Sequence, residues 1–150
     1  MTLPFGLPAE LGVELLDQDT TEAEALGIAW LSARTTAAIR RDRDDPLPFA
    51  VVREVANTED CQQIDSFPVL SVHTLAETEV ACAREARLNH RRMLYLARNP
   101  DTDITVDGQT VNLLWLETVH GPIWLKYECD TVFRKVARYQ LALPFTDIEE

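Results

Sequence analysis

Apolar residues recur at helical spacing in two segments of the chain. Between residues 78 and 98, small and large apolar side chains return every three or four positions until Pro100 breaks the pattern. Between residues 21 and 34, Thr20 or Thr21 can cap a helix, and acidic residues occupy the first turn, where the helix dipole favours them. The pattern therefore predicts two helices, over residues 21–34 and 78–98.

Two extended apolar runs precede the second helix. Residues 49–56 follow Pro46 and Pro48, which stop any preceding helix, and residues 69–75 form a second run with apolar side chains on one face. The polar stretch between them, residues 57–66, is typical of a turn. We therefore expect two strands that pair with each other.

The segments after the second helix predict a meander of strands. Asp107-Gly108 is a dipeptide that a type I′ hairpin favours, because both central residues of that turn need positive φ. A further turn is expected at His120-Gly121-Pro122. Four strand-like runs lie on either side of these turns: residues 104–106, 109–116, 124–128 and 132–143.

This order of elements predicts an α+β fold, with the two main helices packed on one face of a mostly antiparallel sheet. No repeat, low-complexity tract or linker divides the chain, so we expect residues 1–150 to form a single domain. Residues 1–20 are punctuated by Pro and Gly and are expected to form an N-terminal arm, with a short amphipathic turn at residues 10–16.

The chain is acidic, and its acid is unevenly distributed. Fourteen basic and 25 acidic residues give a formal net charge of −11, which repels DNA and anionic membrane surfaces, so tight nucleic-acid binding is not expected. Residues 1–24 carry six carboxylates and no Lys or Arg. The chain has neither a basic, cleavable leader nor a run of about eighteen apolar residues, so we expect it to be neither exported nor inserted into a membrane.

The motifs that mark common catalytic and cofactor sites are missing from the sequence. The five glycines are too dispersed for a dinucleotide-binding or phosphate-cradling loop, and no serine lies in a G-x-S-x-G motif. Residues 101–112 depart from a calcium loop because Val106 occupies the required glycine position. Cys61, Cys82 and Cys129 form no C-x-x-C pair and are expected to be reduced thiols. We therefore expect neither an enzyme nor a bound metal or cofactor.

The histidines and tryptophans are more typical of structural than of chemical roles. The three histidines never form a pair one helical turn apart, so we expect His73 to be a hydrogen-bonded sheet residue, His90 a residue of a polar helix face and His120 a turn residue. The three tryptophans are expected in the core more often than at an interface, although Trp is enriched at interfaces: Trp30, Trp115 and Trp124.

A basic stripe on the second helix is the sharpest feature of the sequence. Its members fall three, four and seven residues apart, with one more arginine beside them: Arg84, Arg87, Arg91 and Arg98, with Arg92 adjacent. One interpretation is an inter-subunit surface that meets acidic surface on a neighbouring copy. The other is a solvated helix face with local Glu–Arg pairs, each of which stabilises by only a few tenths of a kcal/mol. Both stay open at this stage.

The order of segments resembles the tail terminator family of long-tailed bacteriophages (siphoviruses), and several motifs look like its actinobacteriophage branch. The resemblance covers roughly residues 20–145 and consists of patterns of fold, not of chemistry. The motifs are Ala29-Trp30-Leu31, residues 46–52 (Pro-Leu-Pro-Phe-Ala-Val-Val), residues 68–74 (Pro-Val-Leu-Ser-Val-His-Thr), His90-Arg91-Arg92-Met93-Leu94, Pro122-Ile123-Trp124 and residues 136–143 (Val-Ala-Arg-Tyr-Gln-Leu-Ala-Leu).

This resemblance implies a structural virion protein that is assembled in the host cytoplasm. Family members form a hexameric ring at the head-proximal end of the tail tube, where they stop tube polymerisation and dock to the head–tail connector or stopper protein. The partners implied are other copies of the chain, the tail tube protein, that connector, and double-stranded DNA that passes through the lumen without specific binding. The family supplies no catalytic residues. Two alternatives remain: a connector or stopper protein of the same neck, and a small host-acting enzyme or binding domain.

Overall fold

The computed structural model describes residues 18–20, 22–59, 65–125 and 132–147. The main sheet has the strand order β1-β8-β4-β3-β2, and β7 also pairs with β8. All of its pairs are antiparallel except β2 with β3. The strands are β1 (Gln18–Thr20), β2 (Thr36–Ala38), β3 (Phe49–Glu59), β4 (Asp65–Ala76), β7 (Trp115–Trp124) and β8 (Phe133–Asp147). A separate hairpin consists of β5 (Ile104–Val106) and β6 (Gln109–Val111).

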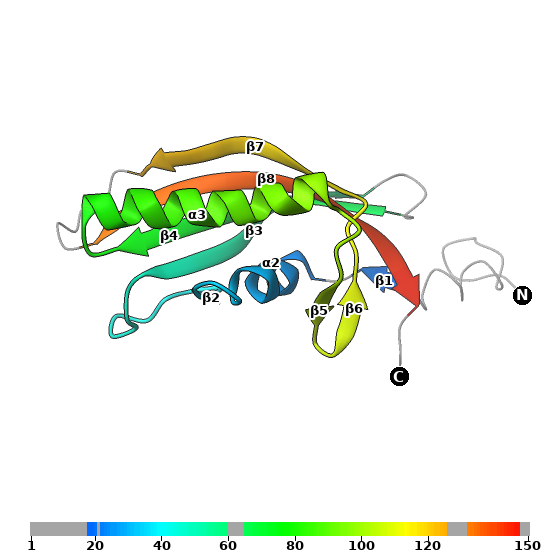
Figure 1. Cartoon of the computed structure of the whole chain (residues 1–150). Coiled ribbons are helices and arrows are strands. Elements are labelled where there is room, and N and C mark those ends of the chain that lie inside the picture. Colours follow the sequence, from blue (N-terminus) through cyan, green and yellow to red (C-terminus); the bar gives the residue numbers. More distant parts are fainter. Residues whose placement is uncertain (1–17, 21, 60–64, 126–131, 148–150) are drawn as a thin grey trace, which may run out of the picture.

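Two helices lie on one face of this sheet, α2 (Ala23–Leu31) and α3 (Glu79–Arg98), as Figure 1 shows. A single apolar cluster joins them to the strands, because Leu26 of α2 and Met93 of α3 are both fully buried in it with Leu70 of β4. The structure therefore confirms the predicted α+β fold, with a mostly antiparallel sheet and both helices on one face.

Helix α3 follows the sequence prediction at both ends. The Thr78 hydroxyl caps it by accepting a hydrogen bond from the Ala81 amide at 3.1 Å, and the Asn99 amide donates to the Tyr95 carbonyl at its end. The buried positions are spaced four and three residues apart, as an amphipathic helix requires: Cys82, Ala86, Asn89, Met93 and Leu96.

Helix α2 is shorter than predicted. It begins at Ala23, and Glu22 is its N-cap residue without a side-chain hydrogen bond. Thr20 cannot cap it because Thr20 belongs to β1, where it is paired with Phe145 of β8; Thr21 lies outside the described residues. The rest of the predicted arm, including the turn at residues 10–16, also lies outside them.

The prediction of a turn over residues 57–66 was wrong at both ends. Strand β3 continues to Glu59 and β4 starts at Asp65, and the two run antiparallel from Asn57 opposite Pro68 to Glu59 opposite Ser66. The Ser66 hydroxyl is buried and donates to the Asn57 side-chain oxygen at 3.0 Å. The polar side chains thus satisfy each other within the ladder instead of marking a loop.

The hairpin prediction is confirmed, whereas the second predicted turn was wrong. Asp107 and Gly108 have φ of 51° and 81°, as a type I′ turn needs. The segment around Gly121 and Pro122 continues strand β7, and its pairing with β8 shifts register on either side of His120. An irregular edge strand tolerates a proline, which lacks an amide donor. Of the predicted strand over residues 124–128, only Trp124 lies in β7, and residues 126–128 lie outside the described residues.

Close packing of α2 against the sheet depends on Gly27. A Cβ at this position would lie 3.0 Å from both a Leu70 methyl and a Val52 methyl. By contrast, a Cβ at Gly121 would meet the His90 ring at an ordinary 3.8 Å. Gly27 therefore sets how near α2 approaches β3 and β4.

We expect Gly27→Ala to lower the free energy of unfolding by about 1 kcal/mol, because overpacking outweighs the gain in helix propensity. Gly121→Ala is the matched control and should change it by less than about 0.5 kcal/mol. Urea denaturation followed by circular dichroism measures both. Equal stability of the two variants would show that α2 can move away from the sheet without cost.

Candidate interaction surfaces

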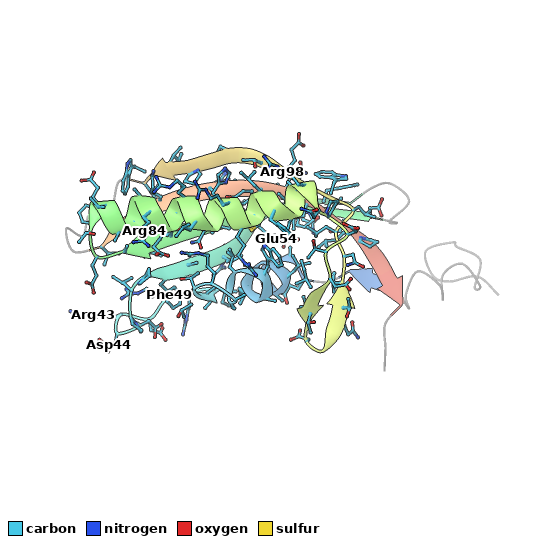
Figure 2. All side chains as sticks on the ribbon, in the orientation of Figure 1. Arg43, Asp44, Phe49, Glu54, Arg84 and Arg98 are labelled. Atoms are coloured by element: carbon cyan, nitrogen blue, oxygen red, sulfur yellow. The ribbon has the colours of Figure 1, made fainter. Side chains whose placement is uncertain are left out.

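Four arginines of α3 form an exposed basic stripe that pairs with no carboxylate in the described part of the chain. Arg84, Arg87, Arg91 and Arg98 are all exposed, and Figure 2 shows Arg84 and Arg98 near opposite ends of the helix. None of the four forms an ion pair with any carboxylate that the structure describes; the pairs that do occur there involve Arg34, Arg40 and Arg53. Glu85 of α3 is already bound to Arg34 at 2.8 Å. Local Glu–Arg pairing on α3 therefore does not account for the stripe.

Arg92 has a different role from the rest of the stripe. Its guanidinium lies 4.0 Å from the centre of the Trp30 ring, and its Nε donates a 2.6 Å hydrogen bond to the Trp30 carbonyl. In return, the Trp30 indole N–H donates to the Arg92 carbonyl at 2.9 Å. Burial, with Arg34 nearby, lowers the pKa of Arg92 below its usual value. Arg92 thus fastens α3 to α2 and is not part of the free basic surface.

A partly buried chain of polar side chains holds α3 in register over the sheet. The Arg34 guanidinium donates to Glu85 and to the Asn89 side-chain oxygen, each at 2.8 Å. Asn89 is only 2% exposed, and its amide donates to the Thr74 hydroxyl of β4 at 3.0 Å. Sequence reasoning missed this network, because nothing in the spacing links Arg34 to residues more than fifty positions away.

A groove of about 580 Å³ lies between the two helices, beside the stripe. Its lining is aromatic and basic: Trp30, Arg34, Leu88, Arg91, Arg92, Tyr95 and Thr102. Trp30 and Tyr95 stack with their ring centres 5.9 Å apart, and Tyr95 remains 51% exposed. The groove therefore offers an aromatic surface next to the unpaired Arg91.

The edge strand β7 carries a second candidate surface, made of apolar side chains. Among the described residues, β7 pairs only with β8, and large apolar side chains are exposed along it and at its ends. They are Leu114, Trp115, Val119, Ile123, Trp124 and Leu125, each between 38% and 53% exposed. The core assignment of Trp115 and Trp124 was therefore wrong. The sequence did contain a sign of this surface, because apolar residues occur at both odd and even positions of the strand. Such a pattern indicates that both faces of the strand are apolar, and not only the face that packs on the core.

Both exposed tryptophans are held by neighbours on the sheet. Trp115 stacks on Phe67 of β4, with ring centres 5.9 Å apart, and Lys135 places its ammonium 4.7 Å from the centre of the Trp124 ring. These contacts orient the rings while leaving much of their surface in solvent. Large aromatic side chains held in this way are typical of protein interfaces.

The histidines have structural partners, but two of them lie elsewhere than predicted. His73 Nε2 lies 2.5 Å from the Ser71 hydroxyl, which confirms a hydrogen-bonded sheet residue. Burial, with Arg134 and Arg138 nearby, lowers the pKa of His73 to about 4, so that it is neutral at pH 7. His90 faces the sheet and hydrogen-bonds the Tyr139 hydroxyl at 2.6 Å, and burial lowers its pKa. His120 lies within β7 and not in a turn.

The part of the chain that the structure describes contains no group of three or more His, Cys, Asp or Glu side chains arranged to hold a metal ion. Cys82 is a buried free thiol, as predicted, and its sulfur donates to the Thr74 carbonyl at 3.3 Å. Cys61 and Cys129 lie outside the described residues. No described helix is long and apolar enough to cross a bilayer.

Comparison with known proteins gives a structural likeness. No family model and no curated protein matches the chain. The fold is similar to that of a chain in the solved structure of the virion of a native gene transfer agent particle, with a TM-score of 0.51 and 12% sequence identity over 81% of this chain and 87% of that one. At this identity, the likeness establishes a shared fold, which extends over most of both chains.

We expect Arg92→Ala to destabilise the protein by about 2 kcal/mol, because it removes the cation–π contact and a charged hydrogen bond between the helices. Arg91→Ala, one residue away and exposed, is the matched control and should cost less than about 0.5 kcal/mol. Thermal unfolding of both variants measures the difference. Equal losses would mean that the Trp30–Arg92 contact does not hold the helices together.

Proposed function

We propose that this chain is a structural virion protein, a tail terminator that forms a ring at the head-proximal end of a phage tail tube. In this role it stops tube polymerisation and joins the tail to the head while DNA passes through the ring. It acts by assembly and not by catalysis, in the virion neck after assembly in the host cytoplasm. The observation that carries the proposal is the exposed apolar edge β7 on a fold shared with a virion chain.

Side-to-side assembly has a physical basis in this sheet. In a ring, one patch of each subunit meets a different patch on the next, so the two sides of the subunit must differ. Here one side of the sheet ends in β7, and the opposite side ends in β2 and β3, where Ile39 and Val55 are also exposed. Burial of apolar side chains at both sides stabilises a closed ring of copies.

The charge distribution also supports self-association. A chain with a formal net charge of −11 repels its own copies unless opposite charges meet where they touch. The unpaired arginines of α3 supply such charges on one surface, and the excess of carboxylates supplies them elsewhere. The predicted role of these arginines in an inter-subunit surface therefore remains part of the proposal.

Replacement of one exposed apolar residue tests the edge directly. We expect Val119→Lys, which places an ammonium in the β7 surface, to leave the monomer folded and to reduce ring formation at least about tenfold. Val80→Lys is the matched control, because Val80 is 82% exposed and belongs to the start of α3 and not to β7. Mass photometry of both variants, with circular dichroism as the test of folding, measures the outcome. Rings of normal abundance from Val119→Lys would remove β7 from the interface.

A tail terminator is distinguished from its nearest alternative by what it binds. We expect the purified chain to form rings with a central hole in negative-stain images, and to shorten tubes when added to polymerising tail tube protein. A connector or stopper protein would bind the head-side ring and leave tube length unchanged. Tubes that elongate equally with and without the chain would contradict the terminator role, and a monomer bound to a metabolite would favour a small enzyme or binding domain.

A further inference from the structure

The basic stripe and the groove beside it form one composite surface. Arg87 and Arg91 are exposed and lack a described carboxylate partner, and Arg91 also lines the groove in which Trp30 and Tyr95 stack. Leu88 adds an apolar side chain to the lining of the groove. A surface of this kind binds a segment that carries carboxylates together with apolar side chains.

The chain itself contains a segment with this chemistry. Residues 1–17 have three carboxylates and no Lys or Arg, and they are rich in large apolar residues. The carboxylates are Glu10, Glu14 and Asp17, and the large apolar residues are Leu3, Phe5, Leu7, Leu11, Val13, Leu15 and Leu16. This segment lies outside the described residues, so its chemistry is read from the sequence alone.

The spacing of the two sets of charges matches. Along α3, Arg84, Arg87 and Arg91 are three and then four residues apart. In the N-terminal segment, the carboxylates at 10, 14 and 17 are four and then three residues apart. A segment bound in helical form and antiparallel to α3 would therefore bring each carboxylate opposite one arginine. In such a helix, Leu11 and Leu15 each follow a carboxylate by one residue and would share the adjacent side.

Strand β1 fixes the point at which the N-terminal segment joins the described fold. In β1, Thr20 is opposite Phe145, and Gln18 is opposite Asp147, the last residue of β8. Residues 1–17 therefore join the described fold at the C-terminal end of β8. Because the proposed ring brings copies side by side, we assign the segment to the groove of a neighbouring copy.

We propose that residues 1–17 of one copy dock on the α3 stripe and the Trp30–Tyr95 groove of a neighbouring copy. This inference rests on the proposed function only in that copies of the chain must meet. It assigns a partner to the arginines and a role to the acidic N-terminus. Ring closure is then strengthened by an arm that reaches from each subunit to the next.

A binding experiment tests the docking without requiring a ring. The probe is a fluorescently labelled peptide with the sequence of residues 1–17, and the receptor is the full chain carrying Glu10→Lys, Glu14→Lys and Asp17→Lys, whose own arm cannot compete. We expect saturable binding by fluorescence anisotropy, weakened at least about tenfold when Arg87→Glu and Arg91→Glu are added to the receptor. The matched control adds Arg40→Glu and Arg43→Glu, in an exposed loop away from α3, and should bind normally. Unsaturable binding, or equal binding by the two receptors, would overturn the proposal even if the chain forms rings.

A mixing experiment then separates docking between copies from docking within one copy. The arm variant has positive charge on both arm and stripe, and the Arg87→Glu, Arg91→Glu variant has negative charge on both. Each variant alone should associate poorly, whereas an equal mixture should regain association, because every arm then meets a stripe of opposite charge on the other variant. Mass photometry reports this directly. Recovery only when all five substitutions are in one chain, and not in the mixture, would place the arm on its own copy and refute the inference.

Discussion

The fastening of α2 to α3 over a single face of the sheet is the constraint on which the remaining surfaces depend. Helix α2 has only nine residues and would be marginal alone, since short isolated helices do not offset the cost of nucleation. It is held by the reciprocal hydrogen bonds between Trp30 and Arg92 and by the Arg34 contacts to α3. Both helices are thus committed to one face, and edge β7 remains exposed.

The helices and strands that could be predicted from the sequence are those whose local residue pattern matches the contacts they make in the fold. Helix α3 has a capping threonine, a regular apolar face and a terminating Asn-Pro, and the type I′ hairpin follows from Asp107-Gly108 alone. The strand pairing of β3 with β4 was also predictable from two neighbouring apolar runs. Strands β1 and β2 were not predicted, because three residues each are too few to show a period.

The errors have a common physical cause, which is pairing between distant residues. Ser66 is polar yet buried because Asn57 accepts its hydrogen bond, and Gly121-Pro122 stays in a strand because β8 pairs on both sides of the irregularity. In the candidate interaction surface on α3, the arginine stripe itself was predictable from the helical spacing of its residues. The separation of Arg92 from it was not, because the decisive partner, Trp30, lies 62 positions away.

Net charge is a poor guide to any one surface of this protein. The overall excess of acidic residues predicts repulsion from phosphate. Residues 1–24, with six carboxylates and no Lys or Arg, account for −6 of the formal net charge of −11. The described surfaces include the basic stripe of α3 and, beside His73 on the sheet, Arg134 and Arg138. His73 adds no charge there at neutral pH, because its pKa is about 4. The lumen of the proposed ring must therefore be understood from the surface that lines it and not from the charge of the whole chain.

Features on both sides of the sheet oppose the addition of further strands. Exposed strand edges invite addition of further strands unless something blocks their amides. On the β3 side, the Glu24 carboxylate accepts a 2.9 Å hydrogen bond from the Glu54 amide, and Arg53 pairs with the same carboxylate at 3.3 Å. On the β7 side, Pro122 and the shifts of register interrupt the ladder. Continuous strand addition is thus opposed at both sides, and in the proposed ring copies would join through side chains. Contacts between specific side chains would fix the angle between neighbours, and such a ring closes only when that angle divides a full turn evenly.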